Sequence, residues 1–120
     1  MRIAITTSGD SLESAFEARF GRAPRFIIVD TEKKTTKIID NAQNLNAAQG
    51  AGIQSALTVL GTGATVVITG HCGPKAFKVL KEAKIAVFTS EAKTVKEALA
   101  LYLDGKLTAA AEADVEGHWA

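Results

Sequence analysis

Residues 64–88 read ATVVITGHCGPKAFKVLKEAKIAVF and carry the strongest structural signal in the chain. The segment Ala64–Thr69 is nearly continuously apolar, which is typical of a parallel strand covered on both faces. Pro74 suits the first turn of a helix, and the apolar spacing after it predicts that helix. A second apolar strand follows at Ile85–Phe88. The succession of strand, helix and strand predicts a βαβ unit.

Three more strands are predicted upstream of this unit. Arg2–Thr7 is β-branched and apolar and ends at a turn, so we expect a central strand there. Phe26–Asp30 and Lys37–Asn41 flank a charged, solvated turn and should pair as an antiparallel hairpin. The segment Ser11–Arg19 has helical spacing over too short a length, and it is predicted to be a loop or a single helical turn.

Two further helices complete the pattern. One carries Ile53, Ala56, Leu57 and Leu60 on one face and ends before Gly61, and the other begins at a capping box after Thr94 and stops at Gly105. Right-handed crossovers then give an α/β fold with a five-stranded mixed sheet, order 3-2-1-4-5, and helices on both faces. We expect one domain over residues 1–107 and an unpatterned tail over residues 108–120.

The composition excludes several classes of function. The chain has 120 residues and a net charge of +1, which gives no general attraction to nucleic acid or to anionic lipid. Aromatic residues make up 6%, too few to favour a base-stacking surface, and no apolar run approaches the ~20 residues that span a bilayer. The N-terminus does not resemble a secretory signal, so a cytoplasmic location is expected. The single cysteine, Cys72, excludes an internal disulfide and a four-cysteine zinc site.

The predicted sheet has a switch point between its first and fourth strands, where ligands of such folds usually bind. Two segments should converge there, namely Ser8-Gly9-Asp10 and Gly70-His71-Cys72-Gly73-Pro74-Lys75. The thiol and imidazole of the second segment are transition-metal ligands, and the helix after it presents unpaired amides to anions. An equally simple interpretation is a strand-to-helix turn with Cys72 as a small buried residue.

Other polar residues are weaker candidates. Asn41, Asn44 and Asn46 could contact a ligand, although clustered asparagines more often form turns. His118 could be a metal ligand near the C-terminus. Thiol catalysis by Cys72 would need a base such as His118, because adjacent residues on a tight turn usually point apart.

Several short motifs in order resemble the dinitrogenase iron-molybdenum cofactor biosynthesis family, which includes NifX, the C-terminal domain of NifB and NafY. These motifs are Phe20-Gly21-Arg22-Ala23-Pro24 followed by Phe26, Gly50-Ala51-Gly52-Ile53, Gly70-x-x-Gly73-Pro74-x-Ala76, Thr94-Val95-x-Glu97-Ala98-Leu99, and Gly105-x-Leu107. The resemblance covers residues 1–107. It implies a ribonuclease H-like fold without nuclease activity, and a non-catalytic carrier of an iron-sulfur or iron-molybdenum-type cluster or its precursor. The chain lacks the additional domains of NifB and NafY, so it corresponds to the minimal module.

The resemblance also implies a site and partners. The resemblance places the site at Ser8-Gly9-Asp10, Phe20-Gly21-Arg22 and the loop Gly70–Gly73. Together with the residues singled out above, the expected cofactor-binding residues are Ser8, Gly9, Phe20, Gly21, Arg22, Asn44, Gly70, Gly73, Pro74 and Lys75, with His71 and Cys72 as metal ligands. The expected partners are the cluster and its donor and acceptor proteins, with no nucleic acid and no membrane, and the chain is expected to be a monomer or a weak homodimer. Two alternatives stay open, a regulatory domain that binds a small anion or a partner without metal, and a thiol enzyme using Cys72.

Overall fold

The computed structural model describes residues 1–41 and 51–110. Within them lies a five-stranded sheet with the order β3-β2-β1-β4-β5. The strands are β1 (Arg2–Thr7), β2 (Arg25–Asp30), β3 (Thr35–Asp40), β4 (Val66–Thr69) and β5 (Ala86–Thr89). The helices are α1 (Ala51–Leu60), α2 (Pro74–Glu82) and α3 (Val95–Leu103), together with a short 3-10 helix, η1 (Phe20–Arg22).

The sheet is mixed, as the sequence predicts. β1 pairs in parallel with β4, and β4 with β5, whereas β2 is antiparallel to both β1 and β3. The predicted strand order 3-2-1-4-5 is therefore confirmed. The hairpin turn is shorter than predicted, because Thr35 already pairs with Asp30 and Lys34 takes a left-handed backbone conformation with φ 55°.

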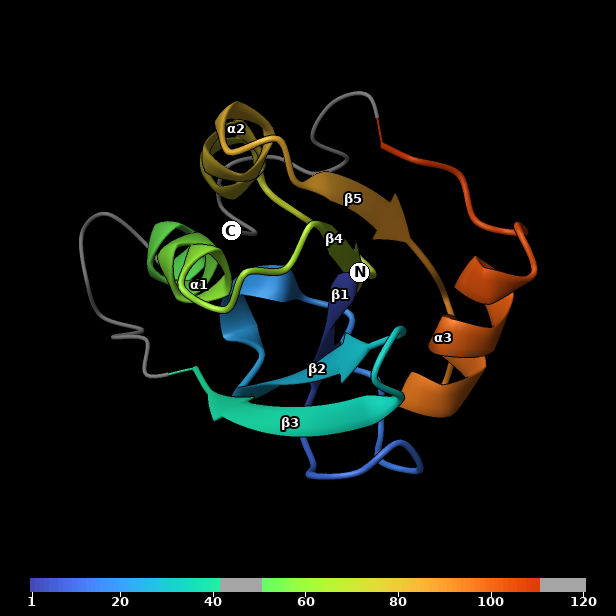
Figure 1. The fold of residues 1–120 in the computed structure, drawn as a ribbon. Helices are drawn as coiled ribbons and strands as arrows, with labels where there is room; N and C mark the ends of the chain where they lie inside the picture. Colours follow the sequence, from blue (N-terminus) through green and yellow to red (C-terminus); the bar gives the residue numbers. More distant parts are fainter. Residues whose placement is uncertain (42–50, 111–120) are drawn as a thin grey trace.

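Helices cover both faces of the sheet (Figure 1). α1 and α2 lie on one face, where Val59 and Leu80 pack on Ala4 and Val67. α3 lies on the other face, where Val95 and the alternate residues of the same strands form a second core. Thr94 caps α3 by accepting a hydrogen bond from the backbone N–H of Glu97 over 3.2 Å, so the predicted capping box has the expected geometry at this residue.

The chain beyond α3 does not simply leave the domain. Ala109 forms a bridge with Phe88 of β5, and the N–H of Ala110 donates to Val87 O over 2.7 Å. The first residues of the expected tail therefore extend the sheet. Three predicted candidates, Asn44, Asn46 and His118, lie outside the described residues. No helix in the described part of the chain is long and apolar enough to cross a membrane.

Candidate functional site

The carboxyl ends of β1 and β4 are closed by the chain itself. Thr6 and Thr69 have no exposed surface, so their hydroxyl groups need partners within the protein. Thr6 Oγ1 donates to Glu17 O over 2.6 Å, and Thr69 Oγ1 donates to Ala18 O over 3.4 Å. Residues 14–20 thus cross the end of the sheet. The crevice that the sequence predicts between the first and fourth strands is filled, because these buried hydroxyls bind the crossing segment.

The crossing segment then pairs with the loop that follows β4. The N–H of His71 donates to Ala18 O over 2.6 Å, and the N–H of Phe20 donates to His71 O over 3.0 Å. This parallel bridge places Arg19 opposite His71, and both side chains are exposed. A Cβ atom on Gly70 would lie 2.7 Å from Ala18 O, so the close approach of the two segments requires glycine at this position.

A cavity of about 370 Å³ opens beside this bridge, at the carboxyl ends of β4 and β5. The described residues that line it are Gly70, His71, Thr89, Ser90, Glu91, Leu101 and Leu107. It therefore contains two of the predicted site residues, one strand away from the predicted crevice. It combines an imidazole, two hydroxyl-bearing residues, the carboxylate of Glu91, and apolar side chains from α3 and the segment after it.

Cys72 points into the core and not into this cavity. Its exposed fraction is 2%, and it packs in the same buried cluster as Phe20 and Ala76. Its Sγ atom lies 3.8 Å from Gly73 O, within reach of a weak sulfur hydrogen bond. This placement is the one expected of a small buried residue at a strand-to-helix turn. The role of Cys72 as a metal ligand stays a prediction, and it would require the loop to open.

The start of α2 keeps the features that the sequence predicts. Gly73 is the N-cap with an extended backbone, Pro74 occupies the first turn, and no side chain caps the helix. Pro74 and Lys75 are exposed, whereas Gly73 is buried. Because the first amides of a helix have no acceptor within it, this end is suited to a negative group, and Lys75 adds a cation beside it.

The segment suggested by the family resemblance is only partly at the surface. Phe20 and Gly21 are buried, and the Phe20 ring packs against Phe26 with centroids 5.6 Å apart. Arg22 is exposed. Arg19 was missed by the sequence reasoning, because its place beside His71 depends on a pairing between distant segments. The recurrence of arginine at positions 19, 22 and 25 was the available signal.

The Ser8-Gly9-Asp10 turn lies apart from the cavity. The N–H of Asp10 donates to Ser14 Oγ over 3.1 Å, and the N–H of Gly9 donates to Thr7 Oγ1 over 3.1 Å. None of the three turn residues is among the described residues that line the cavity. The structure therefore does not bring Ser8 and Gly9 together with His71 there, because residues 14–20 lie over the end of the sheet between them.

The ligand chemistry of the site is limited. Within residues 1–41 and 51–110, no three side chains of histidine, cysteine, aspartate or glutamate are placed so that they could hold a metal ion. Of His71 and Cys72, the two predicted metal ligands within the described residues, His71 has the exposed side chain. Arg19, Arg22 and Lys75 are exposed cations on the adjoining segments, and Arg19 Nε lies 3.5 Å from Glu17 Oε2. These cations and the imidazole can bind a negatively charged group beside the cavity, whereas Glu91 adds one negative charge to the cavity lining itself.

Comparisons with known proteins agree with this fold. The chain is 38% identical to the orange protein of Desulfovibrio gigas, determined in its apo form, with a TM-score of 0.89 over 95% of this chain and 96% of that one. A Thermotoga protein solved by NMR and provisionally named as NifB is 31% identical, with a TM-score of 0.77 over 90% and 91% of the two chains. A protein of unassigned function from Methanocaldococcus jannaschii is 33% identical over 89% of each chain.

The family comparison covers most of the sequence. The model described as dinitrogenase iron-molybdenum cofactor matches residues 1–105. That range includes all five strands, the three helices and the Gly70–Lys75 loop. The resemblance drawn from the short motifs is thereby confirmed. The chain belongs to the dinitrogenase iron-molybdenum cofactor family.

Proposed function

We propose that the protein binds an anionic iron-sulfur or iron-molybdenum-type cluster, or a precursor of one, and passes it on without catalysing a reaction. The observation that carries this proposal is the bridge between Arg19 and His71 beside an open cavity, in a chain of this family. An exposed imidazole can ligate a transition metal, while the neighbouring guanidinium groups can bind the negative charge of cluster sulfides.

The cluster is held mainly by contacts that are not metal–ligand bonds. A single imidazole, or an imidazole with one thiolate, cannot ligate a cluster of four irons completely. The proposed contacts are the side chains of Arg19, Arg22 and Lys75 and the backbone amides at the start of α2. Weak ligation has a functional consequence, since a carrier must release its cargo to an acceptor protein.

The rest of the proposal follows the family. The partners are a cluster donor and a cluster acceptor, nucleic acid and membrane are not involved, and the chain acts in the cytoplasm as a monomer or a weak homodimer. Residues 1–107 form the binding domain, with residues 108–120 as a tail. We also propose that the fold is ribonuclease H-like, which the strand order and the antiparallel first hairpin support. The proposal does not include nuclease activity.

The test is reconstitution without oxygen, using iron and sulfide with and without molybdate, followed by metal analysis and an absorption spectrum. The parent should take up metal in a fixed ratio to protein. Arg19→Gln and His71→Ala should reduce uptake. Arg25→Gln is a matched control, because Arg25 carries the same charge on β2 and pairs with Asp40 over 3.2 Å, away from the cavity.

Cys72→Ala separates the two interpretations of the cysteine. Unchanged uptake in this variant would assign Cys72 to the core, and reduced uptake in a folded variant would make it a ligand. A parent that stays colourless and free of metal after reconstitution would contradict the carrier function. The result would then favour the regulatory alternative, in which the same cations bind a small anion.

A further inference from the structure

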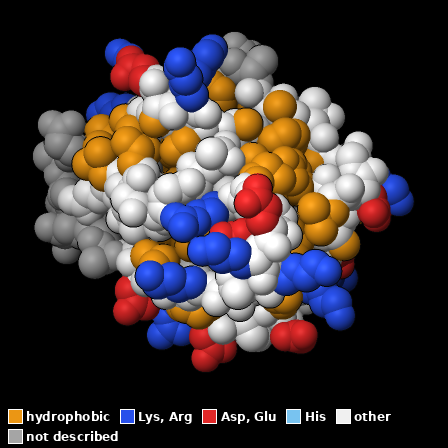
Figure 2. Space-filling view, in the orientation of Figure 1, with side chains coloured by type: hydrophobic (Ala, Val, Ile, Leu, Met, Phe, Trp, Pro, Cys, Tyr) orange, Lys and Arg blue, Asp and Glu red, His pale blue; other side chains and the backbone are white. Residues whose placement is uncertain are grey.

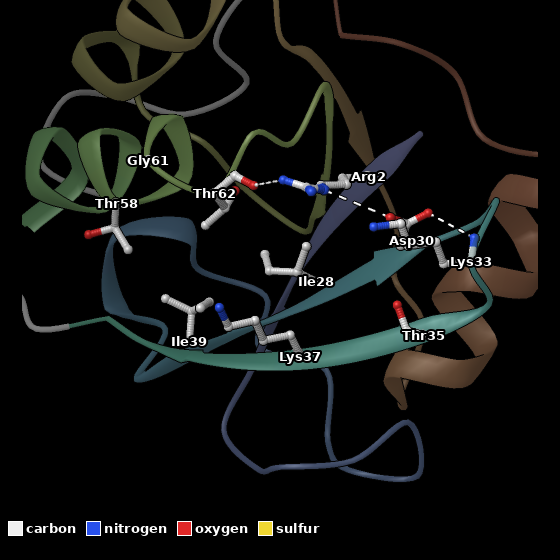
Figure 3. Close-up of a pocket in the computed structure, with 10 residues that line it drawn as sticks. All are labelled: Arg2, Ile28, Asp30, Lys33, Thr35, Lys37, Ile39, Thr58, Gly61 and Thr62. Atoms are coloured by element: carbon white, nitrogen blue, oxygen red, sulfur yellow. Dashed lines mark hydrogen bonds and ion pairs between the residues drawn. The ribbon is translucent and has the colours of Figure 1, made fainter.

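A second cavity opens on the α1 side of the sheet, over β2 and β3, and we call it the β2–β3 groove (Figure 3). Its volume is about 460 Å³, within the range of small-molecule sites. It lies at the amino end of β1, where Arg2 is found, whereas His71 follows the carboxyl end of the parallel strand β4. The groove and the proposed cluster site are therefore at opposite ends of the sheet.

The pairing of β2 and β3 explains why the groove has both apolar and charged walls. Ile28 pairs with Lys37, and alternate residues of each strand face the same side. Ile28 and Ile39 therefore form an apolar floor, while Lys37 rises from β3 toward the end of α1 (Figure 3). α1 packs against η1 and α2 and leaves this part of β3 uncovered.

Positive charge is concentrated around the groove. Its described lining contains three cations, Arg2, Lys33 and Lys37, and one carboxylate, Asp30, which gives a local charge of +2. The whole chain has a net charge of only +1. Figure 2, which views this side, displays lysine and arginine side chains gathered near the middle of the face with acidic groups beside them.

The carboxylate offsets only one of the three positive charges of the groove, and its attraction to Lys33 is not an ion pair with the Lys33 ammonium group. Asp30 Oδ1 accepts the backbone N–H groups of Glu32 and Lys33 over 3.0 and 3.1 Å, and its Oδ2 lies 3.8 Å from Arg2 Nε. The ammonium groups of Lys33 and Lys37 have no ion-pair partner among residues 1–41 and 51–110. Two cations at the groove are therefore available to a ligand.

Arg2 is fixed in place over the groove. Its Nη1 donates to Thr62 O over 3.0 Å, at the C-terminal end of α1, while Asp30 holds the other side of the guanidinium group. Lysine on an edge strand can serve to discourage strand addition, which would account for Lys37 by itself. It does not account for an arginine on the central strand β1 that is oriented toward the same space as two lysines.

From these contacts we propose that the β2–β3 groove binds a small molecule that carries a phosphate group on an apolar body. A phosphate monoester has a charge of about −1.5 to −2 near pH 7, which complements the local charge of the groove. Lys33 and Lys37 would bind the phosphate oxygens, with Arg2 positioned beside them. Ile28 and Ile39 would contact the apolar body. This inference does not depend on the proposed cluster function.

The experiment is a titration of the ¹⁵N-labelled full chain with phenyl phosphate at pH 7.5 and low salt, followed by two-dimensional NMR. Saturable shifts should be confined to β2, β3, the turn between them, Arg2 and the end of α1, which together line the groove. Lys37→Gln and Lys33→Gln should each weaken binding by about tenfold, the loss expected for one charge-assisted hydrogen bond. Inorganic phosphate should bind more weakly than phenyl phosphate, because it does not contact the isoleucines.

Lys34→Gln is the matched control, since Lys34 lies in the same turn but does not line the groove. The affinity of Lys34→Gln for phenyl phosphate should stay within twofold of the affinity of the parent. The NMR spectra themselves report whether each variant is folded. We expect a Kd of about a millimolar or tighter. The absence of saturation at about 10 mM phenyl phosphate would therefore overturn the proposal. The proposal would also be overturned if Lys34→Gln lost as much affinity as Lys33→Gln or Lys37→Gln, or if the NMR shifts were centred on His71.

Discussion

The hydroxyl oxygens of Thr6 and Thr69 lie 3.1 Å apart and join the ends of β1 and β4, which are parallel neighbours in the sheet. Both side chains are fully buried, and both also bind the carbonyls of residues 17 and 18. A pair of threonines thus ties the crossing segment to the end of the sheet. The bridge between Arg19 and His71 follows directly from this attachment.

Thr6→Val is expected to destabilise the protein. The substitution keeps the shape of the side chain but leaves Glu17 O without its hydrogen-bond donor, which typically costs about 1–3 kcal/mol for a buried group. Urea denaturation should report this as a lower midpoint with an unchanged slope. Thr36→Val is the control, because Thr36 is exposed on β3. A similar loss of stability in Thr36→Val would contradict the explanation.

Gly70→Ala tests the close approach of the crossing segment to the loop after β4. The new Cβ atom would lie 2.8 Å from the Ala18 Cα atom, so one of the two segments must move. We expect a loss of about 1–3 kcal/mol in the free energy of unfolding and shifted NMR signals for Arg19. Gly61→Ala is the control, because its new Cβ atom would lie 3.5 Å from Thr58 O, its nearest neighbour. The stability of that variant should be almost unchanged.

Asp30 should contribute to stability in a pH-dependent way. The backbone hydrogen bond from Lys33, assisted by that from Glu32, lowers the pKa of Asp30 below its ordinary value of 3.8. A carboxylate with a lowered pKa in the folded state stabilises the protein above pH 3.8, and this contribution is lost as the pH falls toward the folded-state pKa.

The comparison that checks this is the unfolding of the parent and of Asp30→Asn between pH 7 and pH 2. The variant should be less stable at neutral pH, and the difference should narrow below pH 3.8. Asp104→Asn, at an exposed position after α3, provides the control. A difference between parent and Asp30→Asn that stays constant with pH would show that the charge of Asp30 is unimportant.

Cys72 should react slowly with thiol reagents in the native protein. Its burial limits labelling to molecules in which the loop or the whole domain has opened, so urea below the unfolding midpoint should accelerate the reaction. The time course of absorbance with a chromogenic disulfide at pH 6 and pH 8.5 measures this. Rapid stoichiometric labelling at pH 6 would instead support the thiol-enzyme alternative.

The elements that the sequence predicts well are those with local causes. The continuous apolar run of β4, the proline at the start of α2 and the cap at Thr94 are each readable within a few residues. The strand order follows from the same elements, since right-handed crossovers leave few arrangements. The start of β3 was placed two residues late, because Thr35 and Thr36 are exposed and carry no apolar signal.

The candidate site was harder to predict, because its parts meet through distant pairings. Nothing local in residues 14–20 indicates that they cross the end of the sheet and fill the expected crevice. The same pairing brings Arg19 to His71, and it buries Phe20 beside Cys72. The burial of Cys72 was one of two interpretations that the sequence left open, and only the packing of the loop against α2 separates them.

The crossing segment also constrains the order in which the molecule assembles. The hairpin of β2 and β3 and the unit of β4, α2 and β5 depend on short-range contacts and can form early. Residues 14–20 bind β1, the end of β4 and Lys93 before α3, and those partners must already be adjacent. We therefore expect the surface built on Arg19 and His71 to be completed last, so that a partly folded chain would lack the binding place proposed for the cluster.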